Sequence, residues 1–352
     1  MRNTTTKPNI QSQLNINEKL VFINGHCAIV PKCDVITGKG KNNPVGGFID
    51  WNKKNNSNLT TARRVKNNEY YMQYSQIENE LYNYIEYFNN KTIYCPIDKL
   101  NYEKEQGFVD FFRNNMDLLG IKKIICTIYN PNGKGVVISY DNNSSVVQTL
   151  RGDGAFASTE CKNYMLASDI IVTNPSFSTA RLFISQLMEL NKKFIIVGDV
   201  NMVPYKDVFK HIMLKKMWCG YTKPTYFATD LDNVIKESQY EENGVIYEKF
   251  GNKLWFTNLP VKKEKLQLNK TYNEKSYKVY DESNVIDVNK IKDIPIDFDG
   301  VMGVPVSFIE VYNPNQFEIV GRMNSNSYDG FACYAIIGGK NIYQRILIRK
   351  VK

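Results

Sequence analysis

The tetrapeptide Asn174-Pro175-Ser176-Phe177 combines residue types that can bind a nucleic-acid base. It follows residues 169–173, a β-branched run typical of a buried strand, which Pro175 ends because proline cannot donate to a sheet. The amide oxygen of Asn174 and the carbonyl of Pro175 can accept both hydrogens of an exocyclic amine, while Phe177 can stack on a flat ring. The alternative is an ordinary strand-ending turn with Phe177 in the core.

A second group, Gly152-Asp153-Gly154-Ala155-Phe156, has the composition of a loop that binds a small molecule. Its two glycines allow the backbone to approach a ligand closely. Asp153 can accept a hydrogen bond from an amine, and Phe156 can stack on an adenine ring. Asp98 follows a predicted strand and can accept from an ammonium group or a ribose, although an aspartate in a surface loop is a competing interpretation.

Hydrophobic patterns place these groups in a chain of alternating strands and helices. Strands are predicted over residues 91–95, 121–129, 169–173 and 194–197, and helices over residues 69–87, 106–119, 179–190 and 205–215. This alternation predicts an α/β fold with a mostly parallel sheet, helices on both faces and ligand chemistry at the carboxyl ends of the strands. After residue 217 the strands become shorter, which indicates a β-rich region. Residues 20–23 and 28–30 can pair as a hairpin.

Composition narrows the class of function. The chain has 352 residues, of which 43% are hydrophobic and 23% charged, as in soluble globular proteins. Its net charge of +9 suits a polyanionic partner. Seven scattered cysteines without a Cys-x-x-Cys pair indicate reduced thiols, and with only two histidines no metal site is expected. Because no apolar stretch is long enough to span a membrane and no signal peptide is evident, we expect a cytoplasmic protein without membrane contact.

Several ordered blocks between residues 68 and 352 resemble the EcoRI-type adenine-specific DNA methyltransferases. The tetrapeptide at Asn174 is similar to the Asn/Asp-Pro-Pro-Phe/Tyr/Trp signature of amino-methyltransferases, and the loop at Gly152 is similar to a Gly-Asp-Gly-Asp-Phe block. Further blocks are Glu69-Tyr70-Tyr71-Met72-Gln73-Tyr74, Lys253-Leu254-Trp255-Phe256-Thr257-Asn258, Gly300-Val301-Met302-Gly303-Val304-Pro305 and Arg345-Ile346-Leu347-Ile348-Arg349. The resemblance implies a Rossmann-like catalytic domain that uses S-adenosylmethionine to methylate N6 of a flipped adenine in DNA.

The resemblance also assigns roles to individual residues. It makes the tetrapeptide the catalytic loop, with Asn174, Pro175, Ser176 and Phe177 around the target base. The expected cofactor-binding residues are Tyr70, Tyr71, Gln73, Asp98, Asp153, Gly154 and Phe156, the first three of which would close over the methionine end. No metal ligand is implied.

Two positions in these two loops depart from the family pattern. Ala155 stands where an acid is usual, which removes one acceptor for the amine of the cofactor's adenine. Ser176 replaces the second proline of the signature and leaves the loop with more backbone freedom. These departures keep open the alternative of a catalytically silent, methyltransferase-like DNA-binding protein. A separate alternative is an enzyme that methylates adenine in RNA.

The domain organisation that we expect has three parts. Residues 1–66 form an amino-terminal extension of unknown role, residues 67–262 the catalytic domain that binds S-adenosylmethionine, and residues 263–352 a DNA-recognition region. Basic residues of the last region that can contact phosphates are Lys263, Lys265, Lys290, Lys292, Lys340, Arg345, Arg349, Lys350 and Lys352, with Lys262 just before it. An ordinary edge strand, with Arg345 and Arg349 on its solvated face, is the alternative for residues 344–351. The expected partner is double-stranded DNA, bound by a monomer.

Overall fold

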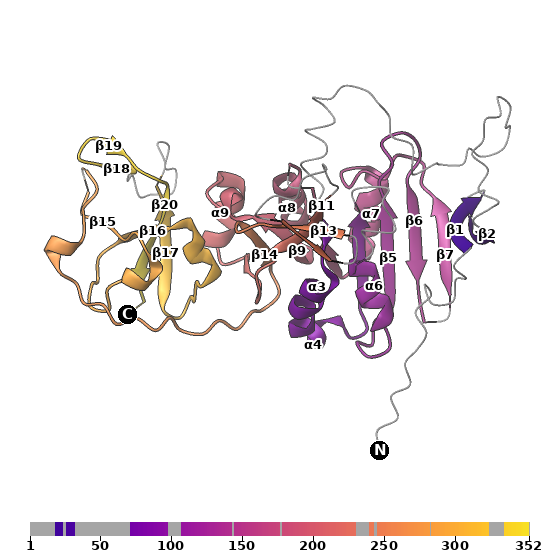
Figure 1. The fold of residues 1–352 in the computed structure, drawn as a ribbon, viewed down its shortest axis with the longest axis horizontal. Helices are drawn as coiled ribbons and strands as arrows, with labels where there is room; N and C mark the ends of the chain where they lie inside the picture. Colours follow the sequence, from indigo (N-terminus) through magenta and orange to yellow (C-terminus); the bar gives the residue numbers. More distant parts are fainter. Residues whose placement is uncertain are drawn as a thin grey trace, which may run out of the picture. The chain divides into compact units, whose positions relative to one another are not determined.

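The computed structural model describes residues 18–23, 26–31, 71–97, 107–142, 144–176, 178–229, 239–242, 245–281, 283–323 and 334–351 (Figure 1). The chain divides into two compact units, residues 1–173 and residues 174–352.

The first unit is built on a sheet whose strands lie in the order β8-β4-β5-β6-β7. Strand β4 (Thr92–Ile97) lies between β5 (Lys123–Ile128) and β8 (Ile170–Thr173) and runs parallel to both. Strands β6 (Val136–Tyr140) and β7 (Ser145–Thr149) continue the sheet in antiparallel register. Every residue of β4 and β8 is buried, as expected for parallel strands covered on both faces.

Aromatic side chains join the helices of this unit to one another. Helix α3 (Tyr74–Leu81) continues through the 3₁₀ turn η2 (Tyr82–Tyr84) into α4 (Ile85–Phe88), and it packs against α6 (Gly107–Asn114). The rings of Phe88 and Phe111 both meet the ring of Phe112 edge-on, with centroids 5.1 and 5.2 Å away. Both helices are shorter than their patterns predict, because Tyr71–Met72 form strand β3 and residues 115–120 form turns.

The predicted amino-terminal hairpin is confirmed. Strand β1 (Glu18–Ile23) pairs with β2 (His26–Pro31) in antiparallel register, with Ile23 opposite His26. The turn between them, at Asn24 and Gly25, lies outside the described residues.

The second unit begins with alternating helices and strands. Helix α8 (Ala180–Glu189) leads into strand β9 (Lys193–Asp199), followed by the 3₁₀ turn η3 (Val200–Met202) and helix α9 (Lys206–Met213). Strand β14 (Lys253–Thr257) is antiparallel to both β9 and β10 (Trp218–Cys219). A further antiparallel group consists of β11 (Tyr226–Thr229), β12 (Gln239–Glu242) and β13 (Val245–Lys249).

The end of the chain is β-rich, as predicted. Its main sheet has the order β15-β16-β20-β17, formed by β15 (Ile286–Asp287), β16 (Met302–Pro305), β20 (Arg345–Lys350) and β17 (Phe317–Arg322). Between these strands lie the 3₁₀ turns η4 (Glu274–Ser276), η5 (Ile291–Asp293) and η6 (Val306–Glu310), and the short pair β18 (Ile336–Ile337) and β19 (Lys340–Asn341).

Strand β20 is not the edge strand proposed from its alternating pattern. It lies between β16 and β17, so both of its edges are paired. Arg345 is only 8% exposed. Its Nε donates to Asp287 Oδ1 at 3.1 Å and its Nη2 to Asn289 Oδ1 at 2.9 Å. The expectation that Arg345 contacts phosphates is therefore wrong, because its charge is already satisfied inside the sheet.

The architecture confirms the predicted α/β, Rossmann-like class, with parallel strands at the centre of the first unit and antiparallel strands towards its edge. Among the residues that the structure describes, no helix is long and apolar enough to cross a membrane. Nor do histidine, cysteine, aspartate and glutamate side chains gather into a possible metal site in those ranges.

Candidate active site

The predicted catalytic loop starts where a buried strand ends. Thr173, the last residue of β8, donates through Oγ1 to the carbonyl of Pro96 on β4 at 2.5 Å. This bond ties the carboxyl ends of the two parallel strands together. The chain then continues into Asn174, which is partly buried, and Pro175, which is buried.

Ser176 connects the loop to the following helix. Its carbonyl accepts from the backbone N–H groups of Thr179 and Ala180, both at 2.9 Å, and α8 starts at Ala180. Its hydroxyl lies 3.0 Å from that of Ser178. The serine thus gives the loop a side-chain hydrogen bond that a proline could not form. Phe177 lies outside the described residues, so its stacking role stays a prediction.

The Gly152–Phe156 loop lies against the carboxyl end of β5. Gly154 has φ +83°, and a Cβ there would stand 2.7 Å from the carbonyl oxygen of Ile128, the last residue of β5. The N–H of Asn130 donates to the carbonyl of Asp153 at 2.7 Å. A Cβ on Gly135 would stand 2.6 Å from that same carbonyl oxygen. The loop is therefore held on two sides by backbone contacts that leave no room for side chains.

The carboxylates in and beside this loop already accept hydrogen bonds from backbone N–H groups. Asp153 Oδ1 accepts from the N–H of Ala155 at 2.9 Å, whereas Oδ2 has no partner within the described ranges. Glu160, in the first turn of α7 (Thr159–Ala167), accepts from the N–H groups of Arg151 at 2.9 Å and Gly152 at 3.3 Å. Asp153 therefore keeps one carboxylate oxygen that can accept from a ligand.

A buried thiol donates a hydrogen bond to the backbone of this loop. Cys161 Sγ donates to the carbonyl of Gly154 at 3.3 Å. Burial raises the pKa of the Cys161 thiol, which keeps it protonated and able to donate at neutral pH. Burial likewise raises the pKa of the hydroxyl of Tyr94, which lies 2.7 Å from Thr127 Oγ1. These neutral groups form hydrogen bonds, and Cys161 lacks the thiolate character of a nucleophile.

The remaining predicted cofactor residues lie around the start of α3 or outside the described ranges. Gln73 precedes α3, and its carbonyl accepts from the N–H groups of Gln76 and Ile77 at 3.1 and 3.4 Å. Tyr71 is described only as part of strand β3, and Tyr70 and Asp98 fall outside the described residues. Phe156 is partly buried in the loop. The cofactor contacts of these residues stay predictions.

Two supporting residues, Asn130 and Gly135, were not indicated by the sequence pattern. Asn130 is 3% exposed; its Nδ2 donates to Lys134 O at 3.1 Å, and its Oδ1 accepts from the N–H of Asn132 at 3.1 Å. It thereby fixes the turn that brings Gly135 onto the Asp153 loop. The sequence signal was the run Asn130-Pro131-Asn132-Gly133, which predicts a turn but not its contact with residue 153.

Comparison with known proteins identifies the class to which this fold and loop belong. The family model described as adenine-specific methyltransferase EcoRI matches residues 58–149 and 133–350. The chain belongs to this family, and it is an adenine-specific methyltransferase.

Curated relatives agree with this assignment. The chain is 36% identical to the Type II methyltransferase M.EcoRI of Escherichia coli, over 84% of this chain and 96% of the relative. It is also 36% identical to the Type II methyltransferase M.MgeORF184P of Mycoplasma genitalium, over 82% and 97% of the two chains. The chain is 31% identical to the Type II methyltransferase M.MpnI of Mycoplasma pneumoniae, over 82% of this chain and 97% of the relative. The similarity therefore spans nearly the full length of these relatives.

Proposed function

We propose that the protein transfers a methyl group from S-adenosylmethionine to N6 of an adenine flipped out of double-stranded DNA, at specific sites. The observation that carries this proposal is the Asn-Pro-Ser-Phe loop after the buried strand β8, in a chain of the adenine-specific methyltransferase family. We further propose residues 67–262 as the catalytic domain and residues 263–352 as the recognition region.

The residues of the first unit fit a cofactor at the carboxyl ends of β4 and β5. A Cβ on Gly152 would meet no atom within 4 Å, so the loop offers open space there, and Asp153 Oδ2 can accept a hydrogen bond. Bound S-adenosylmethionine supplies an electrophilic methyl group. Asp153, Gly154 and Phe156 are proposed to hold its adenosine end, and Tyr70, Tyr71, Gln73 and Asp98 the remainder.

The catalytic loop acts by positioning the amine of the base. The Asn174 amide oxygen and the Pro175 carbonyl accept the two hydrogens of the adenine N6 amine, so the nitrogen lone pair points away from both acceptors. Phe177 stacks on the flipped base and Ser176 ties the loop to α8. Hydrogen bonding to both amine hydrogens increases electron density on nitrogen and stabilises the positive charge that develops there during attack. The mechanism needs orientation rather than a strong base or a covalent intermediate.

Methyl transfer is tested directly with labelled S-adenosylmethionine and three substrates: duplex DNA, single-stranded DNA and RNA. We expect label in N6-methyladenine of duplex DNA. Label only in RNA would replace the DNA assignment by an RNA one. DNA binding without any methyl transfer would identify a catalytically silent relative, which Ala155 and Ser176 leave as the second candidate.

Asn174→Ala tests the assignment of the loop. Methylation should be lost while the affinity for the cofactor changes less than about twofold, because the amide is assigned to the base and not to the cofactor. Asn163→Ala, an amide exposed on α7, is the matched control and should methylate normally. Normal turnover by Asn174→Ala would contradict the assigned role.

The proposed working form is a cytoplasmic monomer that binds one duplex. Light scattering of the purified protein with and without an oligonucleotide duplex measures the stoichiometry. A dimer in the active complex would contradict this part of the proposal.

A further inference from the structure

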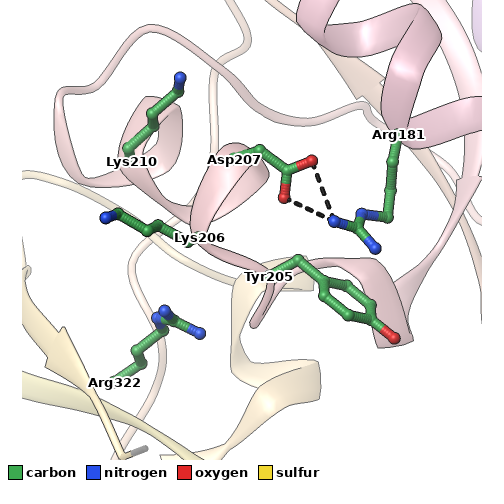
Figure 2. A pocket seen from close by; sticks show the side chains of 6 residues that line it. All are labelled: Arg181, Tyr205, Lys206, Asp207, Lys210 and Arg322. Atoms are coloured by element: carbon green, nitrogen blue, oxygen red, sulfur yellow. Dashed lines mark hydrogen bonds and ion pairs between the residues drawn. The ribbon is translucent and has the colours of Figure 1, made fainter. Parts of the chain in front are cut away.

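Four basic side chains line an open pocket of about 400 Å³ in the second unit. Figure 2 shows them around Tyr205 and Asp207, the two other lining residues. Arg181 belongs to α8, Lys206 and Lys210 to α9, and Arg322 to β17. Four cationic groups face a single carboxylate, so the pocket has an excess of three positive charges.

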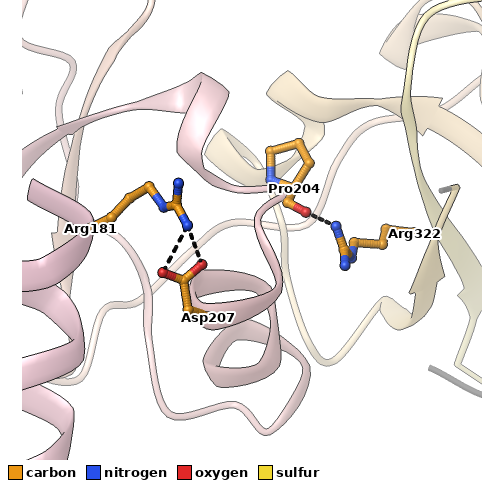
Figure 3. A network of polar contacts seen from close by, with 4 residues as sticks. All are labelled: Arg181, Pro204, Asp207 and Arg322. Atoms are coloured by element: carbon orange, nitrogen blue, oxygen red, sulfur yellow. Dashed lines mark hydrogen bonds and ion pairs between the residues drawn. The ribbon is translucent and has the colours of Figure 1, made fainter. Parts of the chain in front are cut away.

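The two arginines are held in place by the protein (Figure 3). Arg181 Nη2 donates to both carboxylate oxygens of Asp207, at 3.0 and 3.1 Å, and its guanidinium lies 3.8 Å from the centre of the Tyr205 ring. Arg322 Nη1 donates to the carbonyl of Pro204, and its guanidinium lies over the ring of Phe209. Positive groups fixed before binding lose little conformational entropy when an anion arrives.

Arg181 retains donors that its ion pair does not use. A guanidinium has five N–H groups, and Asp207 takes up those of Nη2. Arg181 Nε is buried and has no hydrogen-bond partner among the described residues. A buried donor without a partner is costly, so the Arg181 guanidinium beside the pocket keeps one unmet donor. The exposed ammonium groups of Lys206 and Lys210, one helical turn apart on α9, add charge at the rim.

The pocket is linked by the chain to the catalytic loop. The carbonyl of Ser176 accepts from the N–H of Ala180, and Arg181 is the next residue. The pocket therefore lies at the start of α8, where the loop ends, and at the start of α9. Arg181 and Lys206 belong to the first turns of α8 and α9, the part of a helix where the dipole favours a bound anion.

We propose that this pocket binds a backbone phosphate of the DNA, close to the flipped adenine, through Arg181, Lys206, Lys210 and Arg322. This inference rests on the proposed function, which supplies the DNA. A phosphodiester fits because it is a singly charged anion with two free oxygens, which fixed guanidinium groups and nearby ammonium groups can contact together. The pocket thereby holds the strand beside the loop that receives the base.

The test measures how salt weakens binding of a duplex to the full-length protein. Each phosphate contact contributes about 0.9 to the slope of log K against log salt concentration. The double variant Lys206→Gln/Lys210→Gln should reduce this slope by between about 0.9 and 1.8, depending on whether the lysines share a phosphate. The reduction in slope should be equal for target and unrelated duplexes, because a phosphate carries no sequence information.

Lys193→Gln is the matched control. Lys193 is exposed at the amino end of β9, whereas the pocket follows the carboxyl end of that strand. The control should keep the wild-type slope. A double variant with the wild-type slope would overturn the proposal.

Neutral methylphosphonates, placed singly along the backbone beside the target adenine, give a second measurement on the unaltered protein. One position should weaken wild-type binding clearly more than it weakens binding by the double variant, which has lost two of the four cations. If no position behaves in this way, the pocket does not bind the backbone. Binding of inorganic phosphate at constant ionic strength that is lost in the double variant, but does not weaken DNA binding by the wild type, would identify a free-anion site instead and would also overturn the proposal.

These outcomes separate the pocket from the proposed function. Methyl transfer by the wild type together with an unchanged slope would refute only the pocket. A reduced slope in the double variant of a protein that transfers no methyl group would support the phosphate site and refute only the enzymatic function.

Discussion

Replacing Gly154 by alanine tests the geometry of the proposed cofactor loop. Gly154 has φ +83°, a region that costs an L-residue about 1–2 kcal/mol. The new Cβ would stand 2.7 Å from the carbonyl oxygen of Ile128, which is anchored at the end of a paired strand. Overpacking of this kind typically costs about 1–3 kcal/mol. Alanine also reduces the conformational entropy of the unfolded chain, which stabilises the folded protein by about 0.4–1 kcal/mol. The expected net loss in the free energy of unfolding is about 1–5 kcal/mol.

The same substitution should weaken binding of S-adenosylmethionine. Relief of the clash moves Gly154 away from β5 and carries Asp153 with it, so the dissociation constant should rise about tenfold or more, which corresponds to about 1.4 kcal/mol. Gly152→Ala is the matched control in the same loop, because a Cβ there meets no atom within 4 Å.

Urea denaturation measures the stability of both variants, and titration calorimetry measures their affinity for the cofactor. A Gly154→Ala protein as stable as Gly152→Ala would refute the steric argument. A destabilised Gly154→Ala protein with unchanged cofactor affinity would refute the assignment of this loop to the cofactor.

Three further substitutions address the base, the cofactor and the core. Phe177→Ala should weaken capture of the flipped base by about 1–3 kcal/mol, less on duplexes with a mispaired target adenine; equal defects on paired and mispaired DNA would indicate a core residue. Ala155→Asp should tighten S-adenosylmethionine binding severalfold in calorimetry, by about 0.5–1.5 kcal/mol, and unchanged or weaker binding would mean that another group fills this role. Arg345→Ala leaves Asp287 buried without its cation and should lower the free energy of unfolding by about 3–5 kcal/mol; a loss of DNA affinity at unchanged stability would contradict the buried ion pair.

The strands and the loop of the active site could be predicted from the sequence because their signals are local. The apolar runs that become β4, β5 and β8 are continuous, and a strand buried on both faces requires such a run whatever its neighbours are. Pro175 ends β8 for a covalent reason, since it lacks an N–H group. The helix lengths were predicted less well, because the pattern does not separate a helix from the short strand before Tyr74 or from the turns after Asn114.

Contacts between distant segments were decided only by the tertiary structure. Nothing near Gly135 or Asn130 indicates that both meet the backbone of Asp153, because that contact depends on how β6 and β7 reverse the chain. The alternating pattern of β20 is the same for an edge strand as for an interior one, and only its pairing with β16 and β17 buries Arg345. The ion pair between Arg181 and Asp207 likewise joins residues 26 positions apart. Local periodicity determines which face of an element is apolar, whereas the partner that covers this face depends on the course of the whole chain.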